Sequence, residues 1–236
     1  MGLYISVPFC RQKCSYCNFA SGVFAPAQYE RYVERVSADM AAVGGWVEAL
    51  GARLEPEVDT VYLGGGTPTV LSPGQLQRLF AAARSSFDFA PDAEITVECA
   101  PGTISPQVVD LLLDCGVNRV SLGVQSFVDE EARAVGRMHT RDAVLEEIAR
   151  LQAAGLANIS VDLIAGLPHQ TRESWERSLV DVIAAQVPHV SVYMLEVDDE
   201  SRLGRELLAG GTRYHAHFVP DSDAVADLYL QAGERL

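Results

Sequence analysis

The chain has 236 residues, of which 48% are hydrophobic and 21% are charged, enough for one large core or two modest domains. This composition excludes an intrinsically disordered chain, because disordered chains lack the apolar residues that offset conformational entropy. No apolar run approaches the roughly 20 residues that span a bilayer, and the N-terminus lacks the basic segment of a signal peptide. We therefore expect a cytoplasmic globular protein that does not span a membrane.

The chain is acidic, with 18 Lys and Arg residues against 32 Asp and Glu residues and a formal net charge of −14. Proteins that bind nucleic acid usually present a basic face that displaces counterions from phosphate. The densest arginine spacing, at Arg133, Arg137 and Arg141, is typical of one helix face rather than of a basic arm. The sequence therefore disfavours nucleic acid as a partner.

Six short runs rich in Val, Ile and Leu have the composition of buried parallel strands. They cover residues 3–7, 61–63, 95–98, 119–123, 159–164 and 190–195. Segments with helical periodicity separate them, and two of these segments begin with Ser-Pro, at Ser72 and Ser105, which is typical of an N-cap before proline. Six β-α units are too few for a closed barrel of about 250 residues. We predict an α/β fold, an incomplete (β/α)6 barrel, with a doubly wound open sheet as the alternative.

The pattern changes after the sixth predicted strand. Residues 197–201 are acidic and turn-like, Gly210-Gly211 interrupts the chain, and Asp221-Ser222 predicts the start of a final helix over 223–235. The sequence offers no later element against which this helix could pack. We therefore expect a core over residues 1–200, followed over 201–236 by the beginning of a linker or C-terminal region that is truncated here.

Three of the five cysteines lie within eight residues, directly after the first predicted strand, as Cys10-x3-Cys14-x2-Cys17. An odd number at this spacing is a poor disulfide framework. A structural zinc site normally has four ligands, and neither Cys99 nor His139 lies nearby in sequence. Three thiolates suit an iron–sulfur cubane with one open iron. A zinc site completed from elsewhere, or a redox pair of Cys14 and Cys17, are the alternatives.

Other polar and glycine-rich positions follow further predicted strands. Gly64-Gly65-Gly66-Thr67 is neither a Walker loop nor a dinucleotide fingerprint, but its glycines let the backbone approach a ligand closely. Glu98, Gln125, Asp162 and Glu196 lie at or near the ends of four other strands. A tight turn or a capped strand end would explain each one alone. The carboxyl ends of parallel strands in a barrel share one face, so the cysteines, the glycine-rich turn and these four polar residues should lie together there. This shared position predicts a site on that face.

Six segments match a known family in order. They read YISVPFCRQKCSYCNF, GGGTPT, ECAPGTI, GVQSF, GRMHT and VDLIAGLPHQT. The chain resembles the radical S-adenosylmethionine (SAM) superfamily, in the branch of oxygen-independent coproporphyrinogen III oxidase, and most resembles the heme chaperones of that branch. The resemblance implies a 4Fe-4S cluster on Cys10, Cys14 and Cys17, with SAM on the open iron. It also implies SAM contacts at Tyr4, Gly65, Gly66, Thr67, Glu98, Gln125, Arg137 and Asp162.

Phe19 stands two residues after the last cluster cysteine. The oxidases have a further Cys at this position, and the chaperones have Phe. The resemblance thus implies a chaperone that binds cluster, SAM and heme, takes an electron from a donor and delivers heme to acceptor proteins. The alternative is the oxidase, an enzyme that decarboxylates a porphyrinogen; a structural zinc protein is a third possibility. The C-terminal heme-binding motif of the family does not occur in this sequence, and His215 and His217 do not match it.

Overall fold

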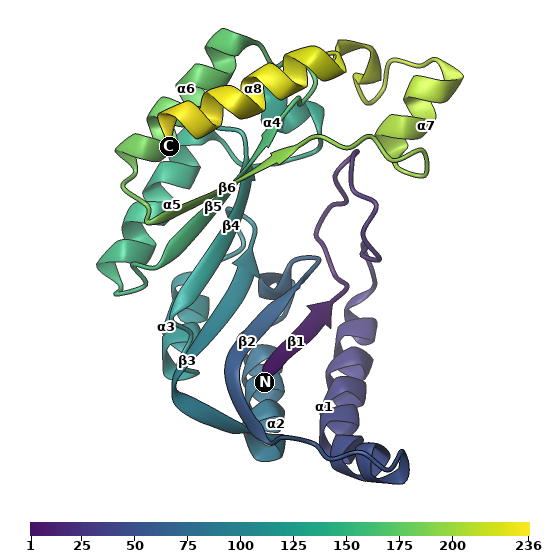
Figure 1. Cartoon of the computed structure of the whole chain (residues 1–236), viewed down its shortest axis with the longest axis vertical. Helices are drawn as coiled ribbons and strands as arrows, with labels where there is room; N and C mark the ends of the chain where they lie inside the picture. The colour runs from purple at the N-terminus through teal and green to yellow at the C-terminus, as the bar shows by residue number, and fades with distance from the viewer.

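The computed structural model describes residues 1–236, and its centre is one sheet of six parallel strands in the order β1-β2-β3-β4-β5-β6 (Figure 1). The strands are Gly2–Val7 (β1), Glu57–Gly65 (β2), Asp88–Cys99 (β3), Arg119–Gln125 (β4), Ile159–Ala165 (β5) and His189–Met194 (β6). β1 and β6 are the two edges and do not pair with each other, so the barrel stays open. The predicted incomplete (β/α)6 barrel is confirmed, with β2 and β3 longer than predicted.

Crossover helices connect the strands, as parallel pairing requires. They are α1 (Pro26–Ala49), α2 (Pro73–Ser86), α3 (Pro106–Asp114), α5 (Arg141–Ala153) and α6 (Arg172–Ala184). The hydroxyls of Ser72 and Ser105 accept hydrogen bonds at 3.3 Å from the backbone N–H groups of Gln75 and Val108. The two predicted N-caps are therefore confirmed, each followed by proline in the first turn.

The segment between β4 and α5 differs from the prediction. A short helix, α4 (Asp129–Ala134), ends before Gly136, whose φ of 82° lies in the left-handed region. Arg133 therefore lies on α4, Arg137 in a loop and Arg141 at the start of α5. The prediction that these three arginines share one helix face is wrong, because the glycine turn interrupts the periodicity.

The region after β6 contains α7 (Arg202–Ala209), which was not predicted, and α8 (Ser222–Arg235), which begins at its predicted cap, Asp221. No element follows α8, and it packs instead on earlier parts of the chain. The indole N–H of Trp175 on α6 donates a 2.8 Å hydrogen bond to the carbonyl of Leu228 on α8. Figure 1 shows α8, in yellow, lying along α6.

The main core lies between the sheet and the helices that cover it, and includes the fully buried Leu63, Leu76, Leu122, Leu151 and Trp175. None of the helices combines the length and apolar composition needed to cross a bilayer. Because all six strands run in one direction, their carboxyl ends meet at one edge, which continues into the loops that carry the predicted site residues.

Candidate functional site

The cysteines lie in the irregular segment between β1 and α1. Cys10 and Cys14 are buried, Cys17 is half-buried, and none forms a disulfide. The loop is closed by backbone hydrogen bonds, including one of 2.9 Å from the N–H of Cys10 to the carbonyl of Gly22. Lys13 donates two further bonds of 3.0 Å, to the carbonyls of Phe19 and Ser21. The three thiols are thus presented by one compact loop at the end of β1.

A buried cation lies beside these thiols. Burial alone would lower the pKa of the Arg137 guanidinium, but the neighbouring Cys14, Tyr16 and Cys10 outweigh it and raise that pKa above its usual value. One terminal nitrogen of Arg137 donates to the carbonyl of Gly123. Arg137 therefore places a buried positive charge beside the cysteine sulfurs.

The cysteine loop fits an iron–sulfur cubane. The chain contains no group of three or more His, Cys, Asp or Glu side chains arranged to hold a single metal ion. A cubane distributes its thiolate ligands over several irons, so those ligands lie farther apart than the ligands of one ion. Three thiols on one loop are a donor set that suits such a cluster, and the buried guanidinium beside them would offset its negative charge.

The glycine-rich turn after β2 packs directly on the cysteine loop. The N–H groups of Gly66 and Thr67 donate to the carbonyls of Val7 at 2.8 Å and Phe9 at 2.7 Å. A Cβ atom at Gly66 would lie 2.6 Å from the carbonyl oxygen of Phe9, so only glycine fits there. A protonated amino group only donates hydrogen bonds, so this turn can hold one only through its carbonyl oxygens.

Glu98, near the end of β3, is bonded to the neighbouring strand. One carboxylate oxygen accepts a 2.8 Å bond from the hydroxyl of Tyr62, and the other accepts a 2.9 Å bond from the N–H of Gly65. Burial raises the pKa of Glu98, these two hydrogen bonds oppose the rise, and Asp162 adds to it. Tyr4 stacks on the ring of Tyr62 with centroids 5.8 Å apart, which links β1 to this group.

Asp162, on β5, is not the unpartnered carboxylate that its apolar strand suggests. The hydroxyl of Ser121 on β4 donates to both of its oxygens, at 3.2 and 3.0 Å. Burial raises the pKa of Asp162, while Ser121, Ser191, Arg119 and Arg137 lower it. Asp162 lies close enough to Glu98 for its negative charge to raise the pKa of Glu98.

Three buried polar atoms at the end of β4 have no hydrogen-bond partner in the chain. They are Oε1 of Gln125, Nε of Arg137 and Nε2 of His139. Gln125 has a φ of 71°, a left-handed conformation that is uncommon for a non-glycine residue. Burial, followed by Arg137, lowers the pKa of His139 to about 4, so its ring is neutral at pH 7. Unsatisfied buried polar groups are costly, and this set suits a polar ligand such as SAM.

The structure brings the cysteine loop and the predicted residues of β1 to β5 toward one end of the sheet, where Tyr62, Ser121 and His139 join them. Arg119, at the start of β4, contributes its charge to Asp162. Only His139 had a signal, within the GRMHT segment. Cys99 is the last residue of β3, with its buried thiol 3.6 Å from the carbonyl of Val97, and Cys115 follows α3. Glu196 is exposed beyond β6.

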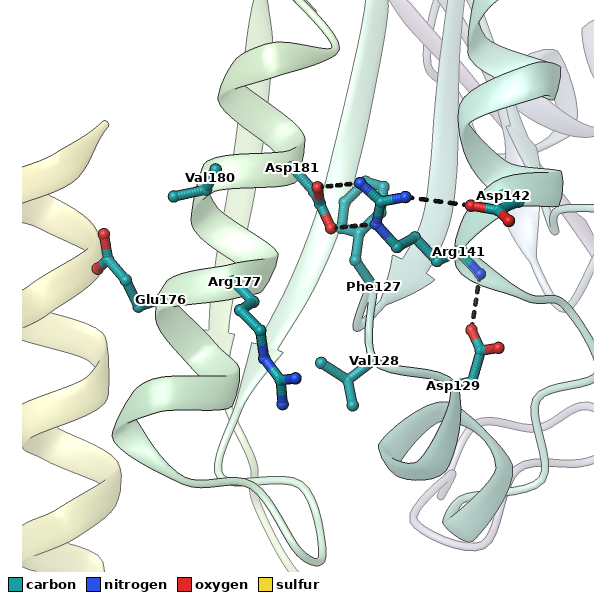
Figure 2. A pocket seen from close by; sticks show the side chains of 9 residues that line it. All are labelled: Phe127, Val128, Asp129, Arg141, Asp142, Glu176, Arg177, Val180 and Asp181. Atoms are coloured by element: carbon teal, nitrogen blue, oxygen red, sulfur yellow. Dashed lines mark hydrogen bonds and ion pairs between the residues drawn. The ribbon is translucent and has the colours of Figure 1, made fainter.

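A pocket of about 550 Å³ lies apart from this edge, between α5, α6 and the loop that precedes α4 (Figure 2). Its central cation is already paired, because Arg141 makes two 2.6 Å bonds to the carboxylate of Asp181. The backbone N–H of Arg141 donates to Asp129 at 2.7 Å. None of the predicted site residues lines this pocket.

Comparison with known proteins agrees with this geometry. Residues 4–182 match the Radical SAM superfamily model. The chain is 35% identical to the "Heme chaperone HemW" of Lactococcus lactis, over 96% of this chain and 56% of that protein. It is 39% identical to an oxygen-independent coproporphyrinogen III oxidase of Bradyrhizobium diazoefficiens, over 72% of this chain and 37% of that protein.

The structure superposes on coproporphyrinogen III oxidase (HemN) from Escherichia coli with a TM-score of 0.83 and 28% identity, over 98% of this chain and 50% of that one. The chain thus spans little more than half the length of the chaperones it matches, as the 59% share of the Escherichia coli HemW also indicates. Membership of the matched family implies a 4Fe-4S cluster and SAM, for which the cysteine loop and the unpartnered polar atoms are suited. The chain belongs to the radical SAM superfamily.

Proposed function

We propose that the chain is the cofactor-binding part of a radical SAM heme chaperone, with its core over residues 1–200 and the start of a C-terminal region over 201–236. An electron donor for the cluster and a heme-accepting protein would be its partners. The observation that carries the cofactor assignment is the meeting of three thiols, one buried guanidinium and three unpartnered polar atoms at one edge of the sheet.

In this proposal Cys10, Cys14 and Cys17 hold the cluster through their thiolates. Arg137 offsets the negative charge of the sulfurs, and Lys13 fixes the backbone of the loop that carries them. When bound, the cluster supplies one electron at a time to SAM. The chain's own contribution is to bind, orient and exclude water around both groups.

SAM would lie across the ends of β2 to β5. The carbonyls of Gly65, Gly66 and Thr67 would accept from its amino group, which is a hydrogen-bond donor. Glu98 and Asp162 accept from hydroxyl or amine donors, while Gln125 and Arg137 use the atoms that lack partners. The exposed ring of Tyr4 would lie near the bound cofactor.

The chaperone is favoured over the oxidase by Phe19, whose side chain is 63% exposed beside the cysteine loop. Met138, next to Arg137, is 80% exposed. Exposed apolar side chains of this size beside a cofactor site suit a flat macrocycle. The oxidase is the second candidate, because the superposition on the Escherichia coli enzyme covers nearly the whole chain.

The test is anaerobic reconstitution, followed by counts of iron and sulfide, heme titration and incubation with coproporphyrinogen III. We expect a cluster, heme binding that strengthens when the chain is extended to the length of the chaperones, and no decarboxylated product by chromatography. Repeated turnover to protoporphyrinogen would establish the oxidase instead. Stoichiometric zinc without iron would reject both assignments.

A further inference from the structure

A segment after β6, residues 198–204, lies directly on the cysteine loop. The backbone N–H of Leu203 donates a 2.8 Å hydrogen bond to the carbonyl of Ser15. Arg202 donates to the carbonyl of Lys13 at 3.3 Å, and the amide of Asn18 donates to Asp198 at 3.1 Å. These three bonds reach the loop before, between and after Cys14 and Cys17. We call residues 198–204 the 198–204 clamp.

The centre of the cysteine loop is held from two sides. While the carbonyl of Ser15 accepts from Leu203, the N–H of Ser15 donates to the carbonyl of Val135 at 3.1 Å. Both backbone groups of Ser15, between Cys14 and Cys17, are thus bonded to segments that are distant in sequence. The position of Cys14 relative to Cys17 therefore depends on the 198–204 clamp as well as on the loop itself.

The 198–204 clamp is rigid through its own hydrogen bonds and packing. Asp198 accepts from the N–H of Glu200 at 2.7 Å and, through its carbonyl, from the N–H of Ser201 at 2.9 Å. The hydroxyl of Ser201 caps α7 by accepting from the N–H of Gly204 at 2.9 Å. A Cβ at Gly204 would lie 2.1 Å from the carbonyl oxygen of Asp198, so no larger residue fits this turn.

We infer that the 198–204 clamp is a positioning element for the cluster: it fixes the spacing of Cys14 and Cys17, and so sets how firmly the cluster is held and its reduction potential. This inference rests on the proposed cluster site. Groups outside the ligand set orient the ligands, and hydrogen bonding and solvent exposure around the sulfurs tune the potential. Four residues of the 198–204 clamp lie outside the 1–200 core, which gives the region after β6 a direct connection to the cluster.

The sharpest variant is Gly204→Ala, with Gly233→Ala as its matched control. Both change a helical glycine to alanine, but an added Cβ at Gly233 meets nothing within 4 Å. Alanine favours helix in both, so a loss specific to Gly204→Ala cannot arise from helix propensity. We expect Gly204→Ala to release iron to a chelator about 10-fold faster than the wild type. Its reduced cluster should also show a changed EPR spectrum and a shifted midpoint potential.

A milder variant guards against misfolding of Gly204→Ala. Arg202→Met removes one side-chain bond to the loop and leaves the turn around Gly204 intact. We expect its EPR spectrum and potential to shift in the same direction by a smaller amount, with the thermal unfolding of the apo-protein unchanged. Cluster properties identical to the wild type in both variants would overturn the inference.

A measurement without the cluster separates this inference from the proposed function. Lys13 is the only lysine in the chain, and its amine is bonded to the carbonyls of Phe19 and Ser21. We expect reductive methylation of Lys13 in the apo-protein, measured by mass spectrometry against the N-terminal amine, to be faster in Gly204→Ala than in Gly233→Ala. If the wild type bound no iron, the proposed function would fail. Equal labelling of the two variants would instead show that the 198–204 clamp does not hold the loop.

Discussion

The cysteine loop and the strand ends hold their functional side chains in different ways. Glu98 and Asp162 lie on β3 and β5, where the hydrogen-bonded sheet and the alternation of side chains fix their direction. The cysteines lie on a loop without regular structure, whose backbone is fixed by Val135 and Leu203. The direction of the side chains at the strand ends is therefore set by the regular pairing of the sheet, whereas the shape of the loop depends on a few individual backbone hydrogen bonds to distant segments.

The electrostatics of the two regions also differ. At the strand ends, two carboxylates have pKa values raised by burial, and hydroxyl groups supply several of their hydrogen bonds. Beside the loop, the pKa of the Arg137 guanidinium is lowered by burial and raised by Cys14, Tyr16 and Cys10, and the net effect is a rise. The comparison predicts that loop variants abolish the cluster itself, whereas strand variants alter what binds next to it.

The largest effect is expected in the loop. Cys10→Ala, Cys14→Ala and Cys17→Ala should each lose the cluster, because a cubane with an open iron has only three thiolate ligands. Iron and sulfide counts after anaerobic reconstitution measure this loss. Cys99→Ala and Cys115→Ala are the controls, since neither cysteine belongs to the loop. Full iron content in the first three variants, or its loss in the controls, would contradict the assignment.

At the strand ends, Asp162→Asn should keep its iron but bind SAM about 10-fold more weakly, the cost of losing a hydrogen bond to a charged group. Glu98→Gln should behave in the same way. The measurement is the SAM concentration that half-changes the EPR spectrum of the reduced cluster. Glu34→Gln on the exposed surface of α1 is the matched control. Loss of iron in the strand variants would mean that these carboxylates support the fold rather than SAM.

The lowered pKa of His139, which lies between the two regions, predicts that the free energy of unfolding falls in acid. Its pKa is lowered from 6.5 to about 4, so the unfolded chain binds a proton before the folded chain does. Stability should therefore be complete above pH 6.5 and fall as the pH drops toward 4, by up to about 3 kcal/mol from this group. Urea unfolding of the apo-protein measures it. The free energy of unfolding of His139→Gln should depend less on pH between 6.5 and 4 than that of the wild type. The same pH dependence in both proteins would show that folding does not lower the pKa of His139.

The smallest effect is expected at Phe19. Phe19→Cys should leave iron content unchanged and alter stability by no more than about 0.5 kcal/mol, because the side chain is mostly exposed. It should also gain no coproporphyrinogen oxidase activity, since catalysis needs several groups in productive geometry. Chromatography of the reaction products tests this. Turnover by Phe19→Cys but not by the wild type would show that this one position separates chaperone from oxidase.

The same contrast explains what could be predicted from sequence. Apolar runs and Ser-Pro caps predicted all six strands and the main crossover helices, because periodicity and capping are local signals. Tyr62 and Ser121 were missed because their roles come from neighbouring strands. Two helices were not predicted: α4 has only six residues and lacks an apolar stripe, and α7 contains Gly204, which disfavours helix. The bonds from Val135 and Leu203 use backbone atoms, which leave no trace in side-chain identity.

The central claim is that the cysteine loop and the strand ends form one cofactor site. The most direct test is the EPR spectrum of the reduced, reconstituted chain before and after addition of SAM. We predict a 4Fe-4S signal that SAM changes in the wild type and changes only at higher SAM concentration in Asp162→Asn. A cluster signal that SAM leaves unchanged in the wild type would contradict the account.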